Sequence, residues 1–208
     1  MKKIILTCLS LFLCYSLNAM NFEAEKQTEL FNIPLETVDV KIIGEIKNNN
    51  PHKELKVLSK NNQNLFNKEI YMLDNENGYS FFYDGKRCCF KIRLYEDKEN
   101  YLFYVDNKNS PILIKISDKW ISSLIIYNDR IYYSTEFNDD TIKSISLLTG
   151  ETQVIEGYYP NVELNISENN NCIFEYEENY YRINNNVIEK FKNEKFRKKC
   201  DFFDFRLY

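Results

Sequence analysis

Residues that could carry out catalysis are few in this chain, and their spacing forms no known catalytic pattern. Nucleophilic catalysis by serine or cysteine needs a nearby base, usually histidine. The sequence holds one histidine, His52, in the turn-like segment 50–53, and it holds no Gly-x-Ser-x-Gly elbow. We therefore interpret His52 as a loop histidine, and we expect this protein to be a non-enzymatic one.

Carboxylates are abundant, with 31 Asp and Glu residues in the chain. Two carboxylates at a set separation are enough for glycoside hydrolysis, so a hydrolase stays open, although the sequence singles out no pair. We interpret Asp139 and Asp140 as part of a hairpin loop, and Glu175, Glu177 and Glu178 as a polar strand face. The chain has no CxxC spacing, so we expect no metal and no cofactor.

Four of the six cysteines follow the N-terminal segment: Cys88, Cys89, Cys172 and Cys200. An even number of cysteines in an exported chain favours disulfide bonds. Cys88 and Cys89 are adjacent and would point to opposite faces of a strand, so each would pair with Cys172 or Cys200. The sequence does not choose between the two pairings, and free buried thiols are the alternative.

Aromatic side chains are numerous, with 16 Tyr and 15 Phe beside a single tryptophan. Tyrosine and tryptophan are common in recognition surfaces because they combine an apolar ring with a polar group. We predict a contact patch formed by Trp120 with Tyr158 and Tyr159, which lie in the connection 157–160, whereas most other aromatic residues pack in the core.

The N-terminal residues 1–19 have the features of a secretory signal peptide. Lys2 and Lys3 precede an apolar stretch and a small-residue cleavage site that ends at Ala19. The stretch has about 14 residues, fewer than the roughly 20 that a spanning helix needs. We therefore expect an exported chain, periplasmic or secreted and of bacterial type, with one domain at 20–208 and no transmembrane segment after signal removal.

Charge argues against nucleic acid as a partner. Loss of Lys2 and Lys3 leaves 25 basic against 31 acidic residues, a net charge of about −6. The segment 189–199 is locally basic, and it fits either protection of a strand edge or contact with an acidic surface. We expect a protein or a cell-envelope component as the partner, and the oligomeric state stays open.

Short β-branched and aromatic runs alternate with Asn, Asp and Gly turns from residue 38 onward, which predicts an all-β antiparallel meander with at most one short helix, at 23–31. Turns are expected at Asn77-Gly78, Asp84-Gly85, Asn128-Asp129 and Thr149-Gly150. We also interpret the asparagine clusters at 48–50, 61–62, 169–171 and 184–186 as turns. The expected strands are 38–46, 54–59, 69–73, 79–83, 87–94, 101–105, 112–116, 122–127, 131–135, 141–147, 152–156, 162–166, 172–176, 180–183, 187–191 and 202–207.

A weak internal repeat relates two of the expected hairpins. Leu102-Phe103-Tyr104 with Lys115-Ile116-Ser117 aligns, at an offset of about 29, with Ile131-Tyr132-Tyr133 and Ser144-Ile145-Ser146. The pattern resembles the middle strands of β-propeller blades of the six-bladed type, most closely over 131–156. The resemblance implies a propeller-like fold with binding loops on one face, and a small sandwich or open meander is the alternative.

These features predict an exported β-rich binding protein of the cell envelope or extracellular space. An inhibitor or immunity-type protein that blocks a toxin or hydrolase is one alternative, and an envelope hydrolase that uses paired carboxylates is another.

Overall fold

The computed structural model describes residues 27–47, 50–73, 81–108, 110–118, 120–135 and 141–191. The expected signal segment 1–19, the Asn77-Gly78 turn, the Asp139-Asp140 loop, Cys200 and the expected strand 202–207 lie outside these ranges. Within the described residues no helix is long and apolar enough to cross a membrane.

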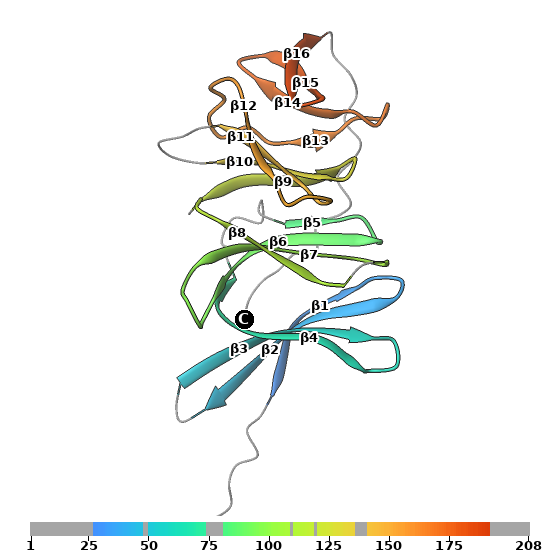
Figure 1. Cartoon of the computed structure of the whole chain (residues 1–208), viewed down its shortest axis with the longest axis vertical. Coiled ribbons are helices and arrows are strands. Elements are labelled where there is room, and N and C mark those ends of the chain that lie inside the picture. The colour runs from blue at the N-terminus through green and yellow to red at the C-terminus, as the bar shows by residue number, and fades with distance from the viewer. Residues whose placement is uncertain are drawn as a thin grey trace, which may run out of the picture.

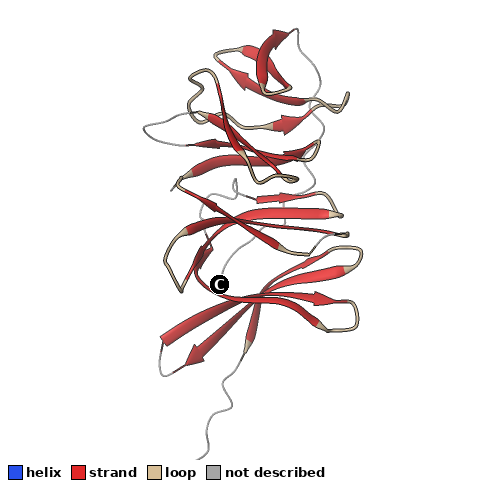
Figure 2. Cartoon of the chain, viewed as in Figure 1, coloured by secondary structure: helices blue, strands red, loops and turns tan. Residues whose placement is uncertain are grey.

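The protein is all-β, as predicted, and the described residues contain no helix (Figure 2). Its strands are β1 (Thr28–Pro34), β2 (Val38–Lys47), β3 (Asn50–Ser59), β4 (Asn64–Leu73), β5 (Phe81–Tyr83), β6 (Arg87–Leu94), β7 (Asn100–Asp106), β8 (Ile112–Ile116), β9 (Ile121–Tyr127), β10 (Arg130–Thr135), β11 (Ile142–Ser146), β12 (Thr152–Ile155), β13 (Asn165–Ile166), β14 (Cys172–Tyr176), β15 (Asn179–Asn184) and β16 (Val187–Phe191).

The helix expected at 23–31 was wrong over its described part, because residues 28–34 form strand β1. Phe31 and Ile33 alternate with exposed residues along β1 and are buried. Strand β1 pairs antiparallel with β2, which supplies the backbone hydrogen-bond partners. Pairing with a neighbouring strand and burial of one face therefore outweigh the local helical preference. Residues 23–26 lie outside the described ranges.

Three antiparallel sheets contain these strands, and they divide into four successive groups of four. The first sheet runs β1-β2-β3-β4-β6-β7-β8, with β5 also paired to β6, and the others run β9 to β12 and β13 to β16. Figure 1 shows the groups following one another along the long axis, with β1–β4 and β13–β16 at opposite ends. The stack is open: within the described residues, the strand pairings do not join the last sheet to the first.

The repeat found in the sequence does not mark equivalent strands. It aligns β7 and β8, the last two strands of the second group, with β10 and β11, the middle two of the third group. The two hairpins share a pattern because each is an antiparallel pair that packs apolar side chains against the core.

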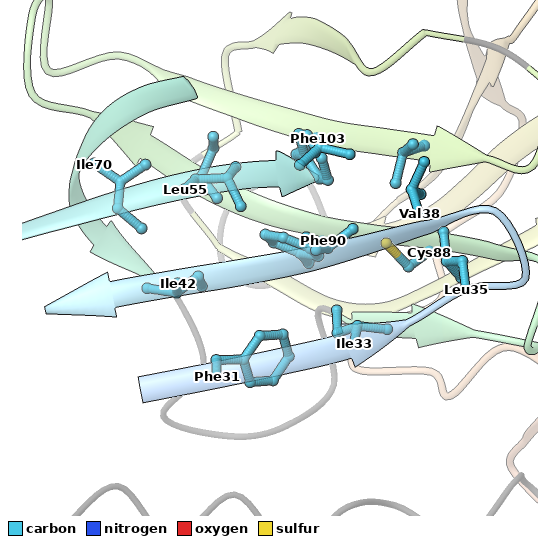
Figure 3. Close-up of a cluster of buried hydrophobic side chains, with 14 of the residues drawn as sticks. Phe31, Ile33, Leu35, Val38, Ile42, Leu55, Ile70, Cys88, Phe90 and Phe103 are labelled. Atoms are coloured by element: carbon cyan, nitrogen blue, oxygen red, sulfur yellow. The ribbon is translucent and has the colours of Figure 1, made fainter. Parts of the chain in front are cut away.

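The first hydrophobic cluster lies where the first sheet folds over, with its β1–β4 half facing β5–β7 (Figure 3). Leu55 and Val57 of β3 share this cluster with Phe90 of β6 and Phe103 of β7, and all four are at most 2% exposed. The rings of Phe90 and Phe103 lie 5.0 Å apart. This cluster joins the first two groups of strands into one body.

Strands β9, β10 and β11 are buried on both faces, so consecutive residues along them are buried rather than every second one. Alternate residues of β10 divide between two further hydrophobic clusters. Ile131 and Tyr133 belong to the second cluster, toward β5–β8, whereas Tyr132 belongs to the third cluster, toward β13–β16. Buried hydrogen bonds add to the second contact, since Ser134 Oγ donates to Val162 O at 2.8 Å and Leu164 N donates to Ser123 Oγ at 3.0 Å. These bonds fix the β12–β13 connection on the third group.

The outer face of β1–β4 is charged and ends the stack on that side. Lys41 pairs with Glu29 at 2.7 Å, and Lys56 pairs with Glu54 at 2.7 Å. A polar outer face on the terminal unit of a stacked array remains solvated, as in the end repeats of solenoid proteins.

Candidate functional site

The predicted contact residues Trp120, Tyr158 and Tyr159 have different surroundings. Tyr159 is partly buried and packs against the core, because its ring lies 5.0 Å from that of Phe174 and 5.4 Å from that of Tyr181. Tyr158 is 64% exposed, and Trp120, just before β9, is 50% exposed with its ring 6.0 Å from the Lys91 ammonium. Only Tyr158 and Trp120 thus keep substantial ring surface for a partner.

Gly157 permits the packing of Tyr159, which yields a first prediction. Its φ of 127° lies in a region that other residues rarely adopt, and an added Cβ would lie 2.2 Å from the Tyr159 ring. That ring cannot move easily, because it is packed among other aromatic rings. We expect Gly157→Ala to lower the free energy of unfolding by about 2 kcal/mol.

Urea denaturation followed by the fluorescence of Trp120 would measure this change. Gly150→Ala is the matched control, since Gly150 also has a positive φ, of 72°, but meets no atom within 4 Å of the added Cβ. An equal loss for both variants would show that backbone strain alone, and not the contact with Tyr159, accounts for the Gly157 effect.

The three described cysteines are free, buried thiols. Cys88 and Cys89 point to opposite faces of β6, as predicted: Cys88 belongs to the first cluster and Cys89 to the second. Cys172 belongs to the third cluster, on the far side of the β9–β12 sheet. The structure therefore contains neither predicted bond to Cys172, because the intervening sheet keeps it away from β6. Bonds to Cys200 involve a residue outside the described ranges.

These thiols should be unreactive in the folded protein. Burial raises the pKa of all three, so little thiolate is present at neutral pH. We expect no alkylation of Cys88, Cys89 or Cys172 by iodoacetamide at pH 8 under native conditions, and complete alkylation in denaturant. Peptide mass spectrometry reads each cysteine separately, and native labelling of any of the three would contradict its burial.

His52 and the acidic cluster differ from their sequence interpretations. His52 lies in strand β3 rather than in a loop, because the β2–β3 ladder continues to Asn50, and its Nδ1 contacts Glu69 Oε1. Glu177 and Glu178 form the two-residue β14–β15 turn, with φ of 49° and 61°, so the expected strand alternation stops at Tyr176. No group of three or more described His, Cys, Asp or Glu side chains is placed to hold a metal ion.

The described residues form a pocket of about 330 Å³ between the third and fourth groups of strands. Tyrosine, amide and arginine side chains of the third and fourth groups line it: Tyr127, Asn128, Arg130, Tyr132, Gln153, Asn184, Asn185 and Asn186. The volume lies at the lower end of the range for small-molecule sites, about 300–1,000 Å³. This pocket is the candidate functional site.

Local backbone geometry brings these side chains to one end of the two sheets. Tyr132, Ser144 and Gln153 lie directly opposite one another across β10, β11 and β12, so they share the face toward the fourth group. On the other side, Asn185 and Asn186 form the two-residue β15–β16 turn, with φ of 48° and 62°. Asparagine tolerates positive φ, which confirms the turn interpretation of this asparagine cluster.

Hydrogen bonds hold the floor of the pocket in place. Asn186 Oδ1 accepts from Tyr132 Oη and from Ser144 Oγ, both at 3.1 Å, and its Nδ2 donates to Gln153 Oε1. The Arg130 guanidinium donates through Nε and Nη2 to Ser144 Oγ, at 3.2 and 3.0 Å, and through Nη2 to Gln153 Oε1 at 3.1 Å. Arg130, Asn186 and Gln153 are therefore positioned before any ligand arrives.

Other polar groups that line the pocket make no hydrogen bond within the described part of the chain. Tyr127 Oη and the side-chain amides of Asn128, Asn184 and Asn185 make no hydrogen bond to another described residue. The ring of Tyr127 lies 6.3 Å from that of Tyr132. Burial raises the pKa of Tyr132 to about 12, so its hydroxyl remains a donor at neutral pH. The pocket thus combines a fixed floor with a rim of available donors and acceptors.

Sequence reasoning missed Arg130 and Gln153 as site residues and treated Asn186 only as part of a turn. The one available signal was that turn itself, because a run of asparagines at a two-residue hairpin exposes several amide groups at one point.

No protein-family model matches the sequence, and no curated protein matches it. Among solved structures, PorZ, a bacterial surface component of the type-IX secretion system of Porphyromonas gingivalis, is similar with a TM-score of 0.36 and 7% identity, over 79% of this chain and 34% of that one. The computationally designed Ika8 protein is similar with a TM-score of 0.31 and 12% identity, over 78% and 74%. The chain thus spans about a third of the PorZ chain.

Proposed function

We propose that this protein is an exported binding protein whose pocket between β9–β12 and β15–β16 holds a polyhydroxylated ligand, a saccharide of the cell envelope or extracellular space. The observation that carries the proposal is the lining: amides, tyrosines and one arginine. An amide offers both a donor and an acceptor, as a sugar hydroxyl does, and a tyrosine ring offers a flat apolar face.

The chemistry of these groups favours binding over catalysis. Arginine stays protonated in proteins, asparagine and glutamine do not titrate, and the pKa of Tyr132 is about 12. A general acid or base works best when its pKa lies near the operating pH. These side chains are therefore suited to hold a ligand rather than to transfer protons at neutral pH.

We propose that the stacked four-stranded groups are an open array related in plan to propeller blades, with a ligand held at the hairpin turns of two neighbouring groups. The pocket lies at the β9–β10 and β15–β16 turns. The signal-like segment 1–19 supports export.

Isothermal titration calorimetry with a panel of mono- and oligosaccharides tests the proposal. We expect at least one saccharide to bind, and Gln153→Ala to weaken it by about tenfold, because Gln153 Oε1 accepts from both Arg130 and Asn186.

Val154→Ala is the matched control, since Val154 follows Gln153 on β12 and is 60% exposed on the other face. Absence of binding across the panel, or equal affinities for the Gln153 variant and the unaltered protein, would contradict the proposal.

A further inference from the structure

We infer that the ligand of this pocket carries a carboxylate, as a uronic acid does, and that Arg130 binds it. The inference rests on the proposed saccharide function and adds the chemical class of the saccharide. It follows from the charge of Arg130, from the neutral acceptors that hold its guanidinium and from the N–H donors that these bonds leave over.

Neutral oxygens alone hold the Arg130 guanidinium. Its acceptors are the Ser144 hydroxyl and the Gln153 side-chain carbonyl, and within the described residues no carboxylate pairs with it. Arg87 and Arg182, by contrast, pair with Asp84 and Glu189 at 2.7 and 2.8 Å. The positive charge of Arg130 is therefore not neutralised by an ion pair.

The Arg130 guanidinium keeps N–H donors that no described residue accepts from. Arginine has five N–H donors, and the bonds to Ser144 and Gln153 use Nε and Nη2 but not Nη1. Nη1 is thus available in a site that Arg130 lines. A partly buried cation with free donors favours an anion, and the planar guanidinium matches the two oxygens of a carboxylate.

The groups around Arg130 suit the rest of a sugar acid. The amides of Asn128, Asn184 and Asn185 are available to hydroxyl groups, and the Tyr127 hydroxyl makes no bond to another described residue. The ring of Tyr127 lies beside that of Tyr132, which gives an apolar side to the same hollow. A simple carboxylate such as acetate could pair with Arg130, but it has no hydroxyl groups to form hydrogen bonds with these amides and with Tyr127.

Calorimetric titration of the full protein with methyl glucuronide and methyl galacturonide, against methyl glucoside and methyl galactoside, tests the inference. Each pair differs only at C6, where a carboxylate replaces a hydroxymethyl group. We expect one uronide to bind roughly tenfold to hundredfold more tightly than its neutral counterpart, and this advantage to shrink as salt rises.

Arg130→Gln should remove the advantage of the uronide, so that the variant binds the uronide and its neutral counterpart with about equal affinity. Arg87→Gln is the matched control, because Arg87 is an arginine on β6 that lies outside the pocket lining and pairs with Asp84. The comparison of uronide with neutral glycoside in the unaltered protein needs no variant, so it decides the question even if Arg130→Gln fails to fold.

The outcomes separate the inference from the proposed function. Equal affinities for uronide and neutral glycoside would overturn the carboxylate assignment and leave the saccharide function standing, whereas no binding of any saccharide would overturn both. Tighter binding of acetate, or of a peptide with a free C-terminal carboxylate, than of either uronide would overturn the assignment to a sugar acid.

Discussion

Phe103→Ala is expected to lower the free energy of unfolding by about 3–5 kcal/mol, the usual cost of removing a fully buried phenylalanine. Phe103 is fully buried on β7, and its ring lies 5.0 Å from that of Phe90 and 5.6 Å from that of Phe66. The ring thus contacts both halves of the first sheet, which surround it (Figure 3). Its loss leaves a cavity that neighbours on two strand groups would have to fill.

Urea denaturation followed by circular dichroism measures the change. Leu148→Ala is the control, because Leu148 is 83% exposed and its truncation should change the unfolding free energy by less than about 0.5 kcal/mol. A loss of under about 1 kcal/mol for Phe103→Ala would mean that the first cluster does not hold the two halves of the sheet together.

Asp118→Asn is expected to lower the free energy of unfolding by about 3 kcal/mol, because it breaks an ion pair that is largely removed from water. Asp118 Oδ1 lies 2.6 Å from Lys143 Nζ, and the two side chains are 8% and 13% exposed. Tyr133 Oη also donates to Asp118 Oδ2 at 2.9 Å. Burial, together with the negative charge of Asp118, raises the pKa of Tyr133, so its phenol stays a donor.

The double variant Asp118→Asn, Lys143→Met provides the decisive comparison. Removing both charges should recover much of the stability lost in the single variant, because the Lys143 charge is then no longer buried opposite a neutral side chain. Thermal and urea unfolding of the two single variants and the double variant complete the cycle. Additive losses would show that Asp118 and Lys143 are not coupled, contrary to their 2.6 Å contact.

Much of the secondary structure could be predicted from local sequence. Alternating apolar residues located most strands between residues 38 and 191, and glycine located the turns at Gly85 and Gly150, whose φ are 84° and 72°. The error at β1 arose because that strand is stabilised by β2 and by burial of Phe31 and Ile33. The pairing strand β2 lies outside the segment 23–31, so the residues of that segment alone could not indicate the pairing.

The pocket could not be predicted in the same way. Asn186 bonds with Tyr132, Ser144 and Gln153, which are 54, 42 and 33 positions away in the chain. No local pattern links an arginine after one turn with an asparagine in another turn. Arg130 and Asn186 come together only because the third group of strands packs one face against the fourth group. That packing depends on Ile125, Tyr132 and the other residues of the third cluster.

Local sequence was enough to predict the all-β class, many of the turns and the opposite orientations of Cys88 and Cys89. Side-chain alternation and the conformational preferences of glycine and asparagine are local properties of the chain. Three features could be known only from the folded chain: the open series of stacked strands, the separation of Cys172 from β6, and the position of Arg130 in a pocket without a described carboxylate partner. These features depend on contacts between sheets, whose energies come from residues far apart in the chain.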